Sequence, residues 1–306
     1  MLEFLLLVAL ADRSVAAESL PAFSVTNEEL LDISKKLRDA DDNKAQPSQI
    51  RLNYQEHTNT HDMTDNAKYR LFSEVDSSLF DRPSYKQFLA LTDNFYRETG
   101  REEPRVSVQE DQLETNAFLS TIMDSRPWEL LYEFLQKKGH PYASGDDNQF
   151  LKWMKKLWFD HYSRAKGKAD TSGFEHIFIG EEKNGEVSGL HNWIRFYMLE
   201  KNNTEELDYK GFVVKRGSVM ASVKFMWKGL PKKSGSLLFG TSPEFDMALY
   251  TLCFLSRRGN DKCEVEIDGF PLSITSYDLS QNGKVYIGTA YPTAGKINNA
   301  NPRFHG

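Results

Sequence analysis

Two of the seven histidines, His176 and His191, lie in one compact run that is rich in glycine and apolar residues. Asn184-Gly185 predicts a turn between them, and Ser188-Gly189 precedes a segment with helical spacing. Such a hairpin-like excursion would bring both imidazoles to one cleft. Two imidazoles that face one substrate suit general acid–base catalysis near neutral pH, because one accepts a proton while the other donates one.

A basic stretch further along the chain offers a third group for the same chemistry. From Tyr209 to Pro243 there are seven basic residues and no acidic residue. A lysine ammonium stabilises charge that develops on phosphate oxygens. Two histidines and one lysine would therefore suffice to cleave RNA by attack of the 2′-hydroxyl, which leaves a 2′,3′-cyclic phosphate. The candidate lysines are Lys224, Lys228, Lys232 and Lys233. A solvated strand face would explain the same charges, and the spacing of the two histidines is by itself weakly informative.

The predicted secondary structure that must position these side chains changes near residue 170, from helices before it to strands and helices after it. Before it, Thr26 and Glu29 form a capping box, and apolar residues follow helical spacing. The helices predicted there cover 84–96, 115–123, 128–135 and 150–162. After it, strands are predicted over 174–179, 219–227 and 284–291, a hairpin over 264–277, and helices over 192–201 and 242–257. We therefore expect an α+β fold, with a helical N-terminal half followed by a mixed, mostly antiparallel α+β region.

The composition of the 306-residue chain is that of an ordinary globular protein, with 40% apolar residues and a net charge of −6. This excess of acidic residues argues against a protein that coats nucleic acid by bulk charge, but it permits a local basic site. No run of 18 apolar residues occurs, so no membrane-spanning helix is expected. The expected parts are a mainly helical part over 24–170, a catalytic α+β part over 171–295 and a tail over 296–306.

The first 17 residues have features of a cleaved secretory signal peptide. An apolar run over 4–11 precedes small residues at 14, 16 and 17. Glu3 stands where a positive charge is usual, and an N-terminal helix packed on a cytoplasmic protein is the alternative. The glycosylation sequon at Asn202 also favours secretion. Cys253 and Cys263 are compatible with one disulfide, but also with two buried thiols.

Several motifs around the two histidines closely resemble the signature of the EndoU family. This family comprises the eukaryotic poly(U)-preferring endoribonucleases, including placental protein 11, and is related to the nidoviral uridylate-specific endoribonuclease. The resemblance covers about residues 24–292 and is strongest after Gly173. The motifs are Gly173-Phe174-Glu175-His176, Ser188-Gly189-Leu190-His191-Asn192-Trp193, Phe225-Met226-Trp227-Lys228-Gly229, Gly240-Thr241-Ser242-Pro243-Glu244-Phe245 and Tyr286-Ile287-Gly288-Thr289-Ala290-Tyr291.

The resemblance implies a catalytic trio of two histidines and one lysine. His176 and His191 match the family's histidines. Lys232 follows the Trp-x-Gly element by a few positions, and Leu230-Pro231 departs from the usual pattern there. Lys233 and Lys224 are the alternative lysines, which would otherwise bind RNA. The resemblance also implies dependence on Mn²⁺ or Ca²⁺, for which Glu175 and Glu181 are the nearest carboxylates. The same two carboxylates could instead orient the histidines.

The substrate implied by the resemblance is single-stranded RNA that contains uridine. Tyr291 would contact the ribose or base before the cut, and the Thr289 hydroxyl would meet the edge of uracil. Thr241 and Ser242, at the start of a predicted helix, offer hydroxyls and free N–H groups for uracil or phosphate. Thr289 and Tyr291 are also ordinary strand residues. A monomer is expected. The alternative function is a catalytically weak, secreted RNA-binding or interaction protein that retains the fold.

Overall fold

The computed structural model describes residues 19–101, 108–165, 167–259 and 261–296. The helices of this part are α1 (Asn27–Asp39), α2 (Pro83–Ala90), α3 (Val108–Met123), α4 (Arg126–Lys137), α5 (Asp147–Phe159), α6 (Trp193–Lys201) and α7 (Pro243–Arg257). Shorter helical turns are η1 (Ser77–Asp81), η2 (Leu91–Asp93), η3 (Pro141–Ala143), η4 (Glu175–Ile179) and η5 (Asn203–Glu205). The predicted capping box at Thr26 and Glu29 is present at the start of α1.

The strands form two antiparallel three-stranded sheets and two short hairpins. One sheet has the order β5-β6-β7 and the other the order β10-β9-β8, while β1 pairs with β2 and β3 with β4. The strands are β1 (Ile50–Leu52), β2 (Phe72–Val75), β3 (Glu181–Lys183), β4 (Glu186–Ser188), β5 (Leu207–Arg216), β6 (Met220–Trp227), β7 (Leu230–Leu238), β8 (Cys263–Ile267), β9 (Phe270–Gln281) and β10 (Lys284–Ala294). The α+β class and the antiparallel pairing are as predicted.

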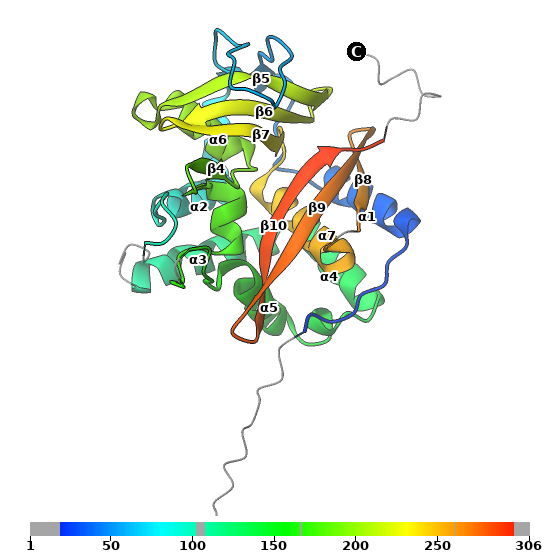
Figure 1. Ribbon diagram of the computed structural model, residues 1–306. Coiled ribbons are helices and arrows are strands. Elements are labelled where there is room, and N and C mark those ends of the chain that lie inside the picture. The colour runs from blue at the N-terminus through cyan, green and yellow to red at the C-terminus, as the bar shows by residue number, and fades with distance from the viewer. Residues whose placement is uncertain (1–18, 102–107, 166, 260, 297–306) are drawn as a thin grey trace, which may run out of the picture.

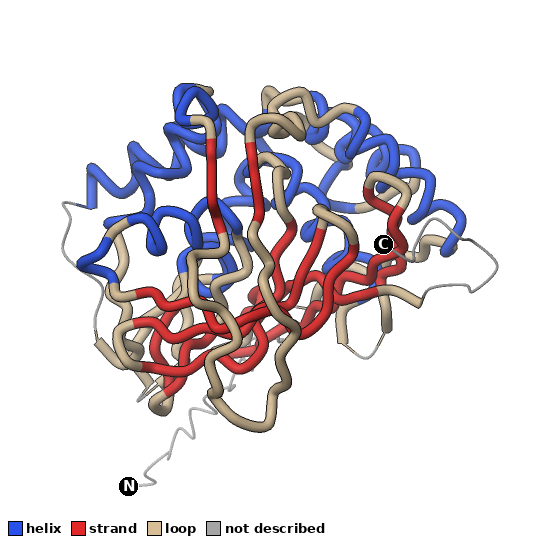
Figure 2. Tube along the Cα trace, turned by 90° about the horizontal axis from the view of Figure 1, so that it is seen from above, coloured by secondary structure: helices blue, strands red, loops and turns tan. Residues whose placement is uncertain are grey.

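The two three-stranded sheets meet where β10 passes β7. Figure 1 shows the C-terminal end of β10 rising towards the sheet of β5, β6 and β7, and β10 packs against both β7 and η4. Most helices gather on one side of the molecule and most strands on the other (Figure 2). The junction between the sheets therefore lies at the face that the helices leave uncovered.

Helix α7 forms the centre of the core. Every residue from Pro243 to Leu255 is buried, as expected for a helix that is surrounded by packed elements on all sides. The Ser242 hydroxyl accepts a hydrogen bond from the main-chain N–H of Phe245, and Pro243 occupies the first helical turn. Helices α1, α2 and α4 and strand β9 pack against α7. Within the described residues, we find no helix with the length and apolarity needed to cross a membrane.

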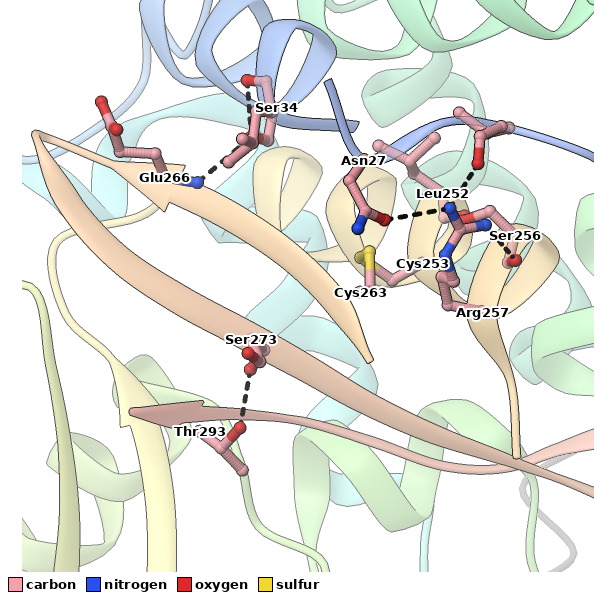
Figure 3. Close-up of a disulfide and its surroundings, with 12 residues drawn as sticks. Asn27, Ser34, Leu252, Cys253, Ser256, Arg257, Cys263, Glu266, Ser273 and Thr293 are labelled. Atoms are coloured by element: carbon pink, nitrogen blue, oxygen red, sulfur yellow. Dashed lines mark hydrogen bonds between the residues drawn. A yellow bond between two sulfur atoms is a disulfide. The ribbon is translucent and has the colours of Figure 1, made fainter. Parts of the chain in front are cut away.

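A disulfide joins α7 to the second sheet (Figure 3). Cys253 on α7 and Cys263 at the start of β8 are both buried, and their Cα atoms lie 5.4 Å apart. Nearby, Arg257 donates a hydrogen bond to the side chain of Asn27, and the Ser34 hydroxyl of α1 accepts one from the N–H of Glu266. Of the two alternatives that the sequence allowed for the cysteines, the structure has the disulfide.

One predicted strand is wrong. The segment predicted as a strand over 174–179 contains a turn of π-helix, Glu175–Ile179, in which the N–H of Gly180 donates to the carbonyl of Glu175. The whole segment is buried, so its alternation of residue types does not reflect an inner and an outer face. The half predicted to be helical also contains the short pair β1–β2. The proposed signal peptide and nearly all of the tail over 296–306 lie outside the described residues.

Candidate active site

The π-helical turn η4 is held in the core by aromatic packing, and this fixes the backbone that carries His176. The ring of Phe174 stacks on Phe159 at 4.8 Å and on Phe178 at 5.1 Å between centroids. The segment that carries His191 then docks beside this turn. Its two main-chain hydrogen bonds run from Leu190 N to His176 O at 3.0 Å and from His191 N to Ile177 O at 2.7 Å. The predicted excursion therefore returns to its start and brings both histidines together.

Gly189 permits this close return. Its φ is +68°, and a Cβ atom at this position would lie 1.7 Å from the carbonyl oxygen of His176. No side chain fits at that distance, and positive φ is the region that favours glycine. The β3–β4 hairpin, turned at Asn184-Gly185, supplies the rest of the path. The predicted turn is confirmed.

The His176 imidazole is hydrogen-bonded through both ring nitrogens. Its Nδ1 lies 2.7 Å from Glu181 Oε1, and its Nε2 lies 3.1 Å from the Thr289 hydroxyl. Burial alone would raise the pKa of Glu181, but the hydrogen bond from His176 and the positive charge of Arg164 lower it. An ionised Glu181 accepts the proton of Nδ1, so Nε2 carries the lone pair and accepts from Thr289.

The His191 imidazole also carries its proton on Nδ1, but this N–H has a different partner. Its Nδ1 donates to the main-chain carbonyl of Ser236 at 3.0 Å, and its ring stacks on Tyr291 with 5.1 Å between centroids. Burial lowers the pKa of His176 to about 4 and that of His191 well below its ordinary value. Both imidazoles are therefore neutral at pH 7, each with Nε2 as its acceptor.

Lys232 is the cation of this site. It lies on β7, is half-buried, and belongs to the same cavity lining as both histidines. Burial lowers its pKa to about 8, although Glu181 and Glu186 oppose this change. The ammonium is charged at neutral pH, and its charge contributes to the lowered pKa of both imidazoles.

A cavity of about 460 Å³ brings the predicted residues together at the junction of the two sheets. Its lining includes His176, His191, Lys232, Thr289 and Tyr291. Four serines that the sequence analysis did not select also line it, namely Ser188, Ser222, Ser234 and Ser236. Two of them, Ser234 and Ser236, follow Lys232 on β7, where the register with β6 shifts between Val223 and Phe225. Because this irregularity interrupts the alternation of faces, the sequence pattern gave no signal for them.

Four predicted substrate contacts lie elsewhere. Thr241 and Ser242 are fully buried, and the N–H of Ser242 donates to Asp41 Oδ2 at 3.3 Å. The free N–H groups that were expected there already have protein partners. Lys224 is fully buried with its Nζ 3.7 Å from Asp62 Oδ1, and Lys233 is exposed. The lining of the cavity contains none of these four side chains.

The two carboxylates predicted as metal ligands, Glu175 and Glu181, differ in their surroundings. Glu181 Oε1 is shared between His176 Nδ1 at 2.7 Å and Arg164 Nε at 3.0 Å, and a neighbouring guanidinium disfavours a second cation. Glu175 is fully buried and lies outside the cavity lining. Among the described residues, no group of three or more His, Cys, Asp or Glu side chains is placed to hold a metal ion. The contact of Glu181 with His176 fits the second interpretation, in which the carboxylate orients the histidine.

Comparison with known proteins gives a family match over most of the chain. The family model described as endoribonuclease XendoU matches residues 29–292. The chain belongs to this family. Uridylate-specific endoribonuclease from Bos taurus is 40% identical over 280 residues, which cover 88% of this chain and 66% of that protein. Poly(U)-specific endoribonuclease from Xenopus tropicalis is 35% identical over 290 residues, which cover 89% of this chain and 96% of that protein.

A solved XendoU-family structure shares the fold. It is described as "The structure of XendoU: a splicing independent snoRNA processing endoribonuclease", and it matches with a TM-score of 0.74 at 32% identity. The match covers 90% of this chain and all of the other chain. The chain spans about two thirds of the bovine relative's length. The resemblance to the EndoU family that the motifs indicated is confirmed.

Proposed function

We propose that this chain is an endoribonuclease that cleaves single-stranded RNA at uridines and leaves 2′,3′-cyclic phosphate ends. The observation that carries the proposal is one cavity lined by two neutral imidazoles and a lysine. The relatives named for uridylate and poly(U) support RNA as the substrate. A protein that only binds RNA has no need of two imidazoles whose tautomers are both fixed.

The reaction follows from the Nε2 atom of each imidazole, which carries no proton. The Nε2 atom of one histidine takes the proton of the 2′-hydroxyl as the O2′–P bond forms. The other imidazole, once protonated, gives its proton to O5′ as the P–O5′ bond breaks. A bound phosphate anion raises the pKa of nearby imidazoles, which allows one of them to carry this proton. Lys232 stabilises the negative charge that grows on the phosphate oxygens.

The wall formed by β10 is suited to hold the uridine. Tyr291 is half-buried, stacks on His191 and lines the cavity, so part of its surface can contact a ribose or a base. The Thr289 hydroxyl donates to His176 and keeps acceptor capacity, which suits the N3–H group of uracil. These two residues therefore contribute the uridine preference in this proposal.

The chain is proposed to act as a secreted monomer. The cavity lining is complete within one chain, so no second copy is needed to form the site. The disulfide between Cys253 and Cys263 is typical of an oxidising compartment. Expression in secretory cells should release the protein into the medium with a new N-terminus near residue 18. An intact Met1 on an intracellular protein would contradict this.

The proposed activity is tested with a short RNA that contains one uridine. The full chain should cut after the uridine, and mass spectrometry of the products should find a 2′,3′-cyclic phosphate. The same RNA with 2′-deoxyuridine should stay intact, because the nucleophile is missing. Parallel reactions with EDTA, Mn²⁺ and Ca²⁺ test the predicted metal dependence separately. RNA that binds to the chain but remains uncut under all of these conditions would favour the alternative, an RNA-binding protein.

A further inference from the structure

Arg164 lies outside the cavity lining, yet its guanidinium connects two parts of the candidate active site. Its side chain is 12% exposed, and its Nε lies 3.0 Å from Glu181 Oε1. Its Nη2 donates to the Tyr162 hydroxyl at 2.9 Å and to the main-chain carbonyl of Gly288 on β10. One cation thus joins the carboxylate that holds His176 to the strand that carries Thr289.

The contact on β10 falls at an irregularity of that strand. The register between β9 and β10 shifts between Ile287 and Thr289, which leaves Gly288 as the extra residue of a β-bulge. A bulge interrupts the ladder and changes the direction of the side chains that follow. The Tyr162 hydroxyl donates to the carbonyl of Ile287 at 3.1 Å, and Arg164 donates to the carbonyl of Gly288. Thr289 directly follows the bulge, and its hydroxyl is hydrogen-bonded to His176 Nε2.

The loop that presents Arg164 is fixed by contacts that do not involve its side chain. The N–H of Arg164 donates to Asp170 Oδ1 at 2.8 Å, and the N–H of Tyr162 donates to the carbonyl of Thr171 at 2.8 Å. The main chain of Ser163 exchanges two hydrogen bonds with the Gln281 side chain, at 2.9 and 2.6 Å. These bonds hold the loop on the β9–β10 hairpin, so the guanidinium is presented from a rigid base.

We propose that Arg164 is a positioning residue for the reaction, which sets the placement of His176 relative to Thr289 by joining Glu181 to the bulge of β10. The inference rests on the proposed function and concerns the same site. Arg164 acts through Glu181 and Gly288, without itself lining the cavity. The planar guanidinium keeps its ion pair with Glu181 and its hydrogen bond to Gly288 at a fixed separation, whereas an ammonium is a point charge and cannot hold both.

The test compares five variants of the full chain with the wild type. We expect Arg164→Ala to lower kcat about 100-fold with KM changed less than about threefold, since a misplacement of about 1 Å can cost that much in rate. Arg164→Lys and Tyr162→Phe keep part of the arrangement and should each lose about tenfold in kcat by the same reasoning. The control is Arg126→Ala, because Arg126 forms an exposed ion pair with Glu129 on α4 and should leave kcat unchanged. Millimolar guanidinium should restore part of the kcat of Arg164→Ala and none of that of His176→Ala.

A kcat of Arg164→Ala within threefold of wild type, with an unchanged melting temperature, would overturn the proposal. If Arg164→Ala fails to fold, Arg164→Lys tests the proposal in its place. A kcat of Arg164→Lys equal to that of the wild type would also overturn the proposal.

A readout without RNA separates this inference from the proposed function. In ¹⁵N NMR spectra of the wild type, His176 should be the Nδ1–H tautomer, and Arg164→Ala should mix the two tautomers. An unchanged tautomer in Arg164→Ala would contradict the role of Arg164 even if the chain cleaves RNA. If the wild type cleaves no RNA, the proposed function is overturned. The tautomer of His176 in Arg164→Ala would still test the role of Arg164.

Discussion

Two groups of polar side chains lie on either side of Asn192, and they differ in whether the cavity reaches them. The candidate catalytic cluster, called the catalytic cluster below, consists of His176, Glu181, His191 and Lys232. The carboxyl cluster consists of Asp41, Glu244 and Asp246, at the first turn of α7. Asn192 follows His191 directly, caps α6 through Arg195 N, and donates to Asp246 Oδ2 at 3.2 Å.

Two members of the carboxyl cluster, Asp41 and Asp246, have raised pKa values, but the cluster does not line the cavity between the sheets. Burial raises the pKa of Asp246 to about 8 and that of Asp41 to about 6. Asp41 pairs with Arg38 at 2.9 Å, and Glu244 accepts a hydrogen bond from Asn43 at 2.6 Å. None of the three carboxylates lines the cavity between the sheets. A perturbed pKa alone would therefore have selected the wrong cluster, and the cavity decides between them.

Among substitutions in the two clusters, removal of either imidazole should lower the cleavage rate most. His176→Ala and His191→Ala should each lower the cleavage rate by about 10²–10⁴-fold or more, because each removes a general acid or base. The melting temperature is compared with that of the wild type, because both rings are buried and hydrogen-bonded and the loss of rate must be separated from any loss of stability. Single-turnover cleavage and thermal unfolding measure the two effects. Cleavage within a few-fold of the wild-type rate in either variant would show that the catalytic cluster has been misassigned.

Lys232 provides the next largest effect, with its neighbour as a matched control. Lys232→Ala should lower kcat by about 10²–10³-fold, because a charge that stabilises the transition state is lost. Lys233→Ala, which changes an exposed side chain on the same strand, should stay within a few-fold. The lowered pKa of about 8 also predicts that kcat falls as the pH rises through 8, because the ammonium loses its proton. If Lys233→Ala were inactive and Lys232→Ala active, Lys233 would be the lysine that stabilises the phosphate charge.

Thr289 and Tyr291 line the cavity from β10. Substitutions there should lower the cleavage rate less than those at His176, His191 and Lys232, and should change the preference for uridine more. Tyr291→Ala removes the ring that stacks on His191, and we expect a loss of about 1–3 kcal/mol in transition-state stabilisation. Thr289→Val should narrow the gap between cleavage after U and after C, because the hydroxyl is lost. Competitive cleavage of U- and C-containing RNAs gives both values. Unchanged selectivity in both variants would place uracil recognition on the cavity serines instead.

The smallest expected effect is in the carboxyl cluster, where stability should change and activity should not. The pKa of Asp246 is raised on folding, so the folded state holds this proton more tightly than the unfolded chain. Stability should therefore fall as the pH rises from about 4, the value of a free Asp, towards 8. Asp246→Asn should flatten this dependence and leave kcat near the wild-type value. Melting curves between pH 4 and 9 check it, and an unchanged pH dependence would mean that Asp246 is not the group responsible.

The family motifs predicted that His176, His191 and Lys232 share one site, and the structure places all three in the lining of one cavity. Gly189 allows the close return that brings the two histidines together. The π-helical turn at His176 was missed, because alternation of residue types in a fully buried segment does not distinguish a strand from a helix.

Thr241 and Ser242 illustrate a different limit. A Ser-Pro pair before an apolar run correctly predicted the start of α7, but capping and substrate binding use the same residue types. Only the packing of α7 decides between these roles, and that packing depends on residues far away in the sequence, such as Asp41. The contact of Arg164 with Gly288 is equally remote, at 124 residues of separation.

The division of acid and base work between the two imidazoles is tested most directly by a sulfur-substituted RNA. In this substrate the leaving O5′ after the uridine is replaced by sulfur, and a thiolate leaves without a proton from the enzyme. We expect that one of His176→Ala and His191→Ala cleaves the sulfur substrate at nearly the wild-type rate, while the other remains slow on both substrates. Equal loss on the oxygen and sulfur substrates in both variants would contradict a division of acid and base between His176 and His191.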